Sequence, residues 1–291
     1  MTDSKSVSDT IAIIGAGEMG AAVGRRMREA GARVLTSLKG RSAASAERTR
    51  LAGLEVIDDD EALVGEAGFV LSIVPPGVAY AVAERLRAPL TSARSKPIFV
   101  ECNAISPATV RRIADLLAGT GCRFVDAGII GGPPPAGRTD GGPRIYASGP
   151  DAPSALRLRE FGLDIRLVDG PVGAASGLKM SYAGLTKGLT ALGAAMIAAA
   201  SRNGLAMALR EELERSQPGL LASLGYGIPS MFPKAYRWVA EMEQIADFLG
   251  GENRGSMIYQ GVARLYADIA AQSERGGGWA AEMASFFAPR K

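Results

Sequence analysis

The sequence contains no histidine among its 291 residues. Imidazole is the side chain that most often carries protons near neutral pH, and it is also a common zinc ligand, so both roles are excluded within this chain. Proton transfer at a catalytic site must then use a lysine, tyrosine, cysteine or carboxyl group.

Cysteine is scarce as well, since the chain has only Cys102 and Cys122. This pair has neither the spacing of a metal site nor the density of a disulfide framework. We expect two reduced thiols near strand ends and no bound metal.

A block of one charge is also missing: the chain has 33 basic and 30 acidic residues and a net charge of +3. Short basic runs such as "GRRMRE" are typical of solvated helix faces. The first residues, "MTDSKSVSDT", lack the order of a signal peptide, and no run of large apolar residues is long enough for a membrane span. We therefore expect no nucleic-acid or membrane partner, a small-molecule substrate, and a cytoplasmic location.

The first half of the chain alternates apolar segments with amphipathic ones. This order is typical of an α/β fold in which a mostly parallel sheet carries helices on both faces. Residues 58–60 precede "EALVGEA" and indicate a helix N-cap. The glycine- and proline-rich "GGPPPAGRTDGGPR" predicts a connection without regular structure. The predicted strands are "TIAIIGAG", "RVLTSL", "LEVI", "FVLSIV", "IFVECNA", "RFVDAG", "RIYASG" and "DIRLVDG".

The composition changes after Gly170 to alanine, glycine, leucine and methionine. Residues 172–217 lack proline, which predicts one long helix bent near 201–204. The segments "KAYRWVAEMEQIADFLG" and "MIYQGVARLYADIAAQSERGGG" are helical by their apolar spacing. We predict two domains, 1–169 and 170–291, the second all-α.

The segment "IAIIGAGEMG" contains GxGxxG between a predicted strand and a predicted helix. In a Rossmann domain the first glycine allows a tight turn, the second lets the backbone approach a pyrophosphate, and the third lets the helix pack on the strand. The N-terminus of the helix offers N–H groups to the phosphates. The N-terminal domain is therefore predicted to bind a dinucleotide.

The second strand ends in "TSLKGRSAAS", without the acid that binds the ribose hydroxyls of NAD. A guanidinium binds phosphate oxygens as a fork, and hydroxyl groups add donors. Ser37, Arg41 and Ser42 therefore favour NADP (NADPH) over NAD, the alternative being a solvated loop.

The motifs, taken in order, resemble the β-hydroxyacid dehydrogenase superfamily, which includes 6-phosphogluconate and 3-hydroxyisobutyrate dehydrogenases. They are "GAGEMG", "SIVPPG", "DAGIIGGPPP" and "GPVGAASGLKMSYAG", followed by a helical C-terminal part. "GRS", "KMSYAGLTKG" and "PKAYRWVAEMEQIADFL" resemble a branch with a C-terminal domain of unknown function. The resemblance implies an N-terminal Rossmann domain, an all-α C-terminal domain and hydride transfer to or from a nicotinamide.

In the family a lysine early in the long interdomain helix is the acid and base at the substrate oxygen, and Lys179 matches it. The alternative is a lysine whose ammonium reaches the surface. Three positions differ from the family. Ala183 replaces the family asparagine, Thr186 replaces the glutamate of the phosphogluconate enzyme, and Ile130 replaces the family serine. The pocket is therefore expected to differ from that of the phosphogluconate enzyme and of the small hydroxyacid enzymes.

Tyr182 follows Lys179 at helical spacing and is predicted to orient or relay the proton, the alternative being a packed tyrosine. Lys187 is expected at a surface or a dimer interface. Arg237 either binds a substrate carboxylate or phosphate, or pairs with Glu241 on a surface. We also predict substrate contacts at Gly131 and Gly132. The predicted cofactor contacts are Gly15, Ala16, Gly17, Glu18, Met19, Gly20, Ser37, Arg41, Ser42, Val74, Pro75, Pro76 and Asn103.

The sequence thus predicts an NADP-dependent oxidoreductase acting on a secondary alcohol or carbonyl of a small (hydroxy)acid. The small residues of the long helix allow close backbone approach and suggest a homodimer through the C-terminal helices. Two alternatives remain at this point: an imine (C=N) reductase, and an NADP-binding sensor without catalytic activity.

Overall fold

The computed structural model describes residues 9–250, 253–274 and 278–288. It divides into two compact units, Met1–Lys179 and Met180–Lys291, named here the N-terminal domain and the helical domain. The division falls inside a helix, later in the chain than the change in composition at Gly170. Residues 1–8, on which much of the signal-peptide prediction rests, and residues 275–277 of the last predicted helical segment lie outside the described residues.

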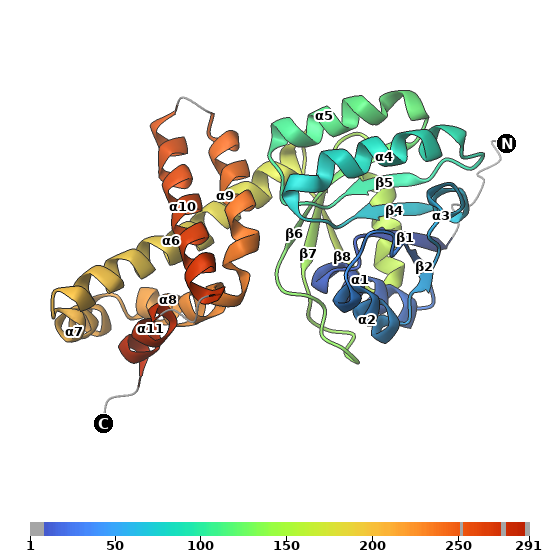
Figure 1. The fold of residues 1–291 in the computed structure, drawn as a ribbon. Coiled ribbons are helices and arrows are strands. Elements are labelled where there is room, and N and C mark those ends of the chain that lie inside the picture. The colour runs from blue at the N-terminus through green and yellow to red at the C-terminus, as the bar shows by residue number, and fades with distance from the viewer. Residues whose placement is uncertain (1–8, 251–252, 275–277, 289–291) are drawn as a thin grey trace. The chain divides into compact units, whose positions relative to one another are not determined.

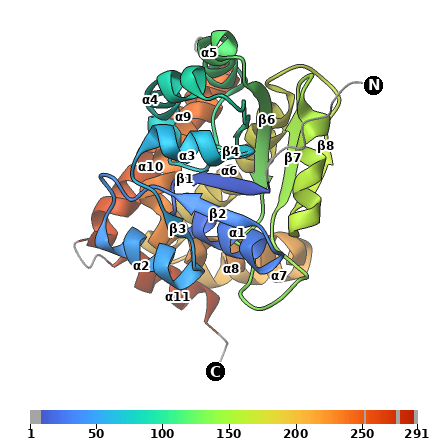
Figure 2. The ribbon, with the colours of Figure 1, turned by 90° about the vertical axis from the view of Figure 1, so that its right-hand side faces the viewer.

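Within the described residues the N-terminal domain forms an eight-stranded sheet in the order β3-β2-β1-β4-β5-β6-β7-β8 (Figures 1 and 2). Neighbouring strands are parallel except β6 and β7, which are antiparallel. The order reverses between β1 and β4, where a doubly wound sheet binds its ligand. The strands are β1 Thr10–Ile14, β2 Arg33–Thr36, β3 Glu55–Val56, β4 Phe69–Ser72, β5 Ile98–Glu101, β6 Arg123–Ile130, β7 Arg144–Ser148 and β8 Asp164–Leu167.

Both faces of this sheet are buried. Ile11 and Ile13 of β1 point into one apolar cluster and Ala12 and Ile14 into another, as the alternation of a strand requires. Helices α1 (Glu18–Glu29), α2 (Ala43–Ala52) and η3 (Ala152–Phe161) contribute to the first cluster. Helices α3 (Asp60–Glu66), α4 (Ala79–Ser92) and α5 (Pro107–Leu117) contribute to the second. Burial on both faces explains why the strands are nearly continuous apolar runs. The short helices η1 Pro76–Val78 and η2 Ala118–Thr120 complete the domain.

Local predictions in this domain are confirmed. The Asp59 carboxylate accepts a hydrogen bond from the Ala62 N–H at 2.8 Å and caps α3. Cys102 and Cys122 are free thiols. Residues 131–143 connect β6 to β7 without helix or strand.

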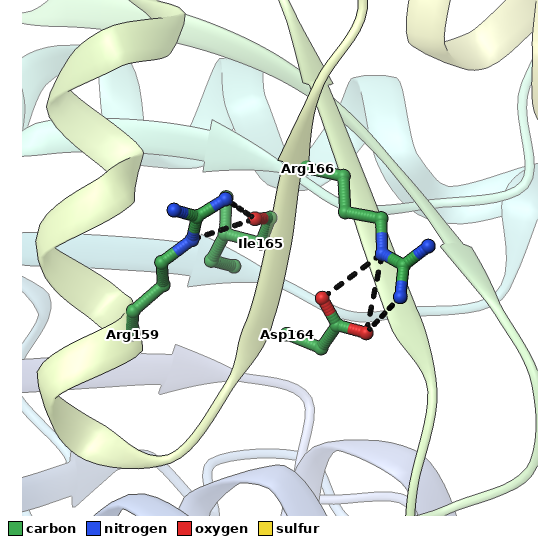
Figure 3. Close-up of polar contacts among 4 residues, drawn as sticks. All are labelled: Arg159, Asp164, Ile165 and Arg166. Atoms are coloured by element: carbon green, nitrogen blue, oxygen red, sulfur yellow. Dashed lines mark hydrogen bonds and ion pairs between the residues drawn. The ribbon is translucent and has the colours of Figure 1, made fainter.

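The edge strand β8 is protected by arginine side chains (Figure 3). Arg159 of η3 donates to the carbonyl oxygen of Ile165, at 2.8 Å from Nε. Beside it, Arg166 and Asp164 form an ion pair at 2.8 Å. A bonded carbonyl group and charged side chains make an edge a poor template for pairing with another strand.

The helical domain consists of most of α6 and the helices that follow it. The single long helix predicted over 172–217 is wrong, because α6 ends at Arg202 and a second helix begins at Ala206. Gly204 adopts the left-handed conformation, with φ of +70°, and so ends the helix where only a bend was expected. The helices are α6 Ala174–Arg202, α7 Ala206–Ser216, α8 Pro218–Met231, η4 Phe232–Lys234, α9 Ala235–Phe248, α10 Arg254–Glu274 and α11 Trp279–Phe287.

Lys187 and Glu241 form an ion pair inside the helical domain. Glu241 is only 5% exposed, and the Lys187 ammonium lies 4.9 Å from the ring centre of Trp238. The Tyr266 hydroxyl donates to the Lys187 carbonyl at 2.7 Å. The prediction that Glu241 lies at a surface is therefore wrong, and Lys187 is held by this ion pair inside the helical domain rather than at a solvated surface.

Among the described helices, α6 alone is long and apolar enough to cross a membrane. The core helix of a globular domain passes the same test, and the ion pair of Lys187 with Glu241 ties α6 to α9.

Candidate cofactor and active site

The turn after β1 holds the three glycines of the fingerprint. Gly15 has a φ of +100°, and a Cβ on it would lie 2.4 Å from the Ile73 carbonyl oxygen after β4. A Cβ on Gly20 would lie 2.1 Å from the Gly15 carbonyl oxygen. No atom lies within 4 Å of the Cβ position of Gly17. The outer glycines are thus required by packing, and the middle one leaves space beside the start of α1.

The N-terminus of α1 is suited to an anion. Gly17 is the N-cap, so no capping side chain occupies this end of the helix. Ala16 is buried and Met19 half-buried against the core, while Glu18 is exposed. The space beside Gly17 and the positive end of the helix dipole fit a pyrophosphate.

The hydroxyl groups after β2 are already hydrogen-bonded within the chain. Ser37 donates to the Asp58 carboxylate at 3.4 Å, and the Leu38 N–H donates to the same oxygen at 2.8 Å. Ser42 is the N-cap of α2 and accepts a bond from the Ser45 N–H at 3.3 Å. Both side chains therefore shape the turn. Asp58, which was predicted to belong to a helix cap, is the residue that holds this turn.

Arg41 lies half-buried in the same turn. Burial lowers the pKa of its guanidinium, and the charge of Arg85 on α4 lowers it further. Arg85 pairs with Asp60 at 3.2 Å. Among the described residues no carboxylate forms an ion pair with Arg41, so this turn carries an unneutralised positive charge.

Asn103 and the loop after β4 are held together. The Asn103 side-chain oxygen accepts a hydrogen bond from the Val74 N–H at 2.6 Å, and its amide donates to the Ser72 hydroxyl at 2.8 Å. Pro75 and Pro76 follow at the start of η1. The predicted cofactor residues of β4 and β5 therefore form one unit at the carboxyl edge of the sheet.

A buried polar row crosses the sheet beneath these turns, and it was missed from the sequence. Ser72, Glu101, Asp126 and Ser148 lie opposite one another on β4 to β7 and are at most 1% exposed. Burial raises the pKa of Glu101 to about 8, and the Asp126 charge contributes. Acidic residues inside the apolar strands "IFVE" and "RFVDAG" were the available signal.

Asp126 anchors the start of α6. Its carboxylate accepts hydrogen bonds from the N–H groups of Gly173 and Ser176, at 2.8 and 3.2 Å, and from the hydroxyls of Ser148 and Ser176, at 2.8 and 2.5 Å. A Cβ on Gly128 would lie 2.9 Å from the Lys179 Cβ. The first turns of α6 are therefore fixed directly on β6, and with them Lys179.

The loop that follows β6 begins with the two glycines predicted to contact the substrate. A Cβ on Gly131 would lie 3.0 Å from the Pro143 Cα, whereas no atom lies within 4 Å of that position on Gly132. Arg25 donates to the Pro134 carbonyl at 3.0 Å, and buried Arg26 donates to the Thr139 carbonyl at 3.1 Å. The solvated helix face predicted for "GRRMRE" is therefore wrong for Arg26, which holds this loop on α1.

Two predicted residues belong to the helical domain. Tyr182 follows Lys179 one turn later on α6, and its side chain is 45% exposed. Arg237 lies on α9, with its guanidinium 5.7 Å from the ring centre of Tyr236. Their roles toward a substrate stay predictions.

Two family models match this chain. Residues 10–154 match the NAD binding domain of 6-phosphogluconate dehydrogenase, and residues 200–269 match a domain of unknown function. An uncharacterized 28.5 kDa protein of Methanothermus fervidus is 30% identical over 71% of this chain and 77% of its own length. The chain belongs to the β-hydroxyacid dehydrogenase superfamily, in the branch with this C-terminal domain.

Solved structures show the same fold. A conserved protein of unknown function, described as structurally similar to 3-hydroxyacid dehydrogenases, is 31% identical over 92% of this chain and 99% of its own, with a TM-score of 0.67. The 3-hydroxyisobutyrate dehydrogenase of Mycobacterium tuberculosis is 20% identical over 97% of this chain and all of its own, with a TM-score of 0.72. An imine reductase of Myxococcus stipitatus in complex with NADP+ is 19% identical over 96% of this chain and all of its own, with a TM-score of 0.54.

The superfamily assignment and the glycine turn agree. The N-terminal domain of this β-hydroxyacid dehydrogenase relative is an NAD(P)-binding domain, and its family supports an oxidoreductase.

Proposed function

We propose that this protein is an NADP-dependent oxidoreductase that acts on a secondary alcohol or carbonyl of a small (hydroxy)acid. The observation that carries the proposal is the position of Lys179 at the start of α6, against β6. Its helix is bonded to Asp126, and its Cβ position lies against Gly128, so the lysine is fixed in the dinucleotide-binding domain itself. A fixed amine can act as acid and base at one substrate atom.

Lys179 is the proposed catalytic residue. In the oxidation direction its amine takes the proton of the substrate hydroxyl; in the reduction direction its ammonium gives that proton to the carbonyl oxygen. The ammonium also stabilises negative charge that develops on the oxygen. Tyr182, on the next turn of α6, is the proposed orienting or relaying group.

The nicotinamide ring, when bound, supplies or accepts the hydride. The turn at Gly15, Gly17 and Gly20 would hold the pyrophosphate, and Asn103 with Val74 would contact the ribose next to the ring. Arg41 supports NADP, because a half-buried guanidinium without an ion-pair partner among the described residues gains most from a 2′-phosphate.

The proposed substrate contacts are Gly131 and Gly132 from the loop after β6, and Arg237 from α9. Ile130, at the place of the family serine, is buried, and so is Ala183, at the place of the family asparagine. These two positions cannot hydrogen-bond a substrate through their side chains. We therefore propose a substrate other than 6-phosphogluconate.

The deciding experiment replaces Lys179. A panel of hydroxyacids, ketoacids and cyclic imines is first screened for formation or consumption of NADPH. Lys179→Ala is then expected to lower kcat by about 100-fold or more, because it removes the acid and base. Its dissociation constant for NADPH, measured by fluorescence titration, is expected to stay within about threefold, because the proposed phosphate site is the glycine turn after β1 and not Lys179.

Lys96→Ala is the matched control. Lys96 precedes β5, so it lies at the amino ends of the parallel strands, away from the carboxyl ends where the cofactor site is proposed. Its ammonium donates to the carbonyl groups of Leu90 and Thr91. Its loss should leave kcat unchanged. Full turnover in Lys179→Ala would overturn the mechanism.

Imine reduction is the second candidate, favoured by the structural likeness to imine reductases and by the loss of the family asparagine at Ala183. Turnover of cyclic imines but not of ketoacids would select it. If NADPH binds and no hydride acceptor is reduced, the protein is a cofactor-binding sensor. We further propose a cytoplasmic homodimer as the working form.

A further inference from the structure

Two carboxyl groups lie next to each other inside the N-terminal domain. Glu101 of β5 is paired in register with Asp126 of β6, and the two residues are at most 1% exposed. Two negative charges so placed repel each other at low dielectric. One of the two groups is therefore expected to keep its proton.

The hydrogen bonds indicate which of the two carboxyl groups keeps its proton. Asp126 accepts four bonds, all from N–H or hydroxyl donors, which suits a carboxylate. Glu101 accepts a bond from the Asn103 N–H at 3.0 Å through Oε1, while its buried Oε2 has no hydrogen-bond partner among the described residues. A buried charged oxygen without a donor is costly, so the proton belongs on Glu101.

Each carboxyl group supports a different part of the site. Glu101 bonds the backbone of Asn103, whose side chain holds the Val74 N–H at the start of the loop after β4. Asp126 bonds the start of α6, three residues before Lys179. The loop after β4 and the start of α6 therefore rest on two neighbouring carboxyl groups, of which Glu101 is the one expected to be protonated.

We propose that Glu101 is a positioning residue, which acts through Asn103 on the cofactor loop and does so in its protonated form. Loss of the proton places a second charge beside Asp126, so that Asn103 and Val74 are displaced and cofactor binding weakens. This inference rests on the cofactor site of the proposed function.

The other titratable and charged groups around Glu101 and Asp126 come from four elements. On its own strand, Cys102 is buried, and its thiol pKa is raised by burial and by both carboxyl groups. From α5, the Arg111 Nη1 lies 2.8 Å from the Cβ position of Gly173. From α6, Lys179 lies one turn beyond Ser176, and β4 contributes only the hydroxyl of Ser72. Asp126 is the neighbour whose charge acts on Glu101.

The expected pH dependence follows from the raised pKa of Glu101, about 8. Below that value the free protein holds the proton and binds cofactor fully. Above it, each further pH unit costs about a tenfold loss of affinity, because binding must then restore the proton. NADPH and NADH should be affected alike, since the two cofactors differ only in the 2′-phosphate, which the proposed function assigns to Arg41.

The experiment measures dissociation constants for NADPH and NADH by fluorescence titration between about pH 7 and about pH 9.5. Glu101→Gln keeps an acceptor for the Asn103 N–H and cannot ionise. It should match the wild-type affinity at neutral pH and stay flat, while the wild type weakens by about tenfold or more. Glu84→Gln, the same change at an exposed position of α4, should follow the wild-type curve.

A flat wild-type curve, or an equal fall in Glu101→Gln, would overturn the inference while leaving the cofactor site intact. If neither the wild type nor any variant binds NADPH or NADH, the proposed cofactor site is overturned together with this inference. If Glu101→Gln does not fold, infrared difference spectra of the wild type decide the matter. A protonated carboxyl band present at neutral pH must disappear at alkaline pH, and its absence would contradict the assignment.

Discussion

Arg41 carries a charge that the described part of the chain leaves without an ion-pair partner. Its guanidinium is half-buried, burial lowers its pKa, and Arg85 adds a second positive charge nearby. Arg85 has Asp60 as its partner, at 3.2 Å. Such an arrangement becomes favourable when an anion binds, which is the physical basis of the proposed preference for NADP.

Replacing Arg41 by alanine is expected to weaken NADPH binding by about tenfold or more, because a charge-assisted bond to phosphate is lost. NADH binding should change by less than about threefold. Both constants are measurable by isothermal titration. Arg50→Ala is the control, since Arg50 is exposed on α2 and pairs with Glu47. Equal weakening of both cofactors would contradict NADP preference.

At the same scale, the turn at the glycines was predictable from the sequence, whereas the hydrogen bonds of the hydroxyl groups after β2 were not. Gly15, Gly17 and Gly20 act through their own backbone, so the spacing alone reveals them. Ser37 was assigned to the cofactor, but its hydroxyl donates to Asp58, a residue of a different strand connection. Only folding brings those two together.

At the scale of elements, α1 has a second role besides presenting its N-terminus. Arg26, only 6% exposed, donates to the carbonyl groups of Thr139, Gly141 and Gly162, and Arg25 donates to that of Pro134. The loop 131–143, which begins with the predicted substrate glycines, is thereby tied to α1, the helix whose N-terminus is the proposed pyrophosphate site.

Arg26→Met removes the charge-assisted hydrogen bonds to three loop carbonyl groups and is expected to lower the free energy of unfolding by about 2 to 3 kcal/mol. Hydrogen exchange, read by mass spectrometry, should become faster in residues 131–143. Arg138→Met removes an exposed ion pair with Asp140 in the same loop and should cost about 1 kcal/mol or less. Unchanged exchange in Arg26→Met would show that the loop is held by other contacts.

In the C-terminal half, apolar periodicity predicts where helices form but not where they end or which side chains they pair. The apolar spacing indicated helix throughout 172–217, which is correct for most of its length. The break at Gly204 comes from its left-handed conformation. The pairing of Lys187 depends on Glu241 and Trp238, which lie on another helix. The sequence of an apolar helix does not show whether a lysine in it has an acidic partner on another helix.

At the scale of the whole molecule, α6 carries an apolar stripe of Leu185, Leu189, Leu192 and Met196. These residues are 52 to 67% exposed and repeat at intervals of four, three and four. That spacing is typical of a helix seam that packs against another helix. A second copy of the chain offers the same stripe, so a two-fold pair of α6 helices would cover both. This supports the proposed homodimer.

Leu189→Glu with Leu192→Glu is therefore expected to convert the dimer to a monomer, because two buried charges would face their own copies in the seam. Light scattering after size-exclusion chromatography reads the mass, and circular dichroism checks that the helices persist. Leu51→Glu, at an exposed apolar position of α2, should leave the mass unchanged. A dimeric double variant would exclude this seam.

The sequence by itself determined the features that depend on neighbours along the chain. These are the strand and helix order, the glycine turn, the cap at Asp59 and the ordered motifs around Lys179. Each follows from backbone geometry or periodicity within one segment. They suffice for the superfamily and for a nicotinamide cofactor.

Only the tertiary structure decided which polar groups meet. The register of β5 and β6 places Glu101 beside Asp126, and the packing of α6 on β6 places Lys179 over Gly128. Arg26 was predicted on a solvated face and Lys187 at a surface or a dimer interface, because a charged residue has no visible partner in its own segment. Burial and charge pairing join segments far apart in sequence, and that is why they became known only from the fold.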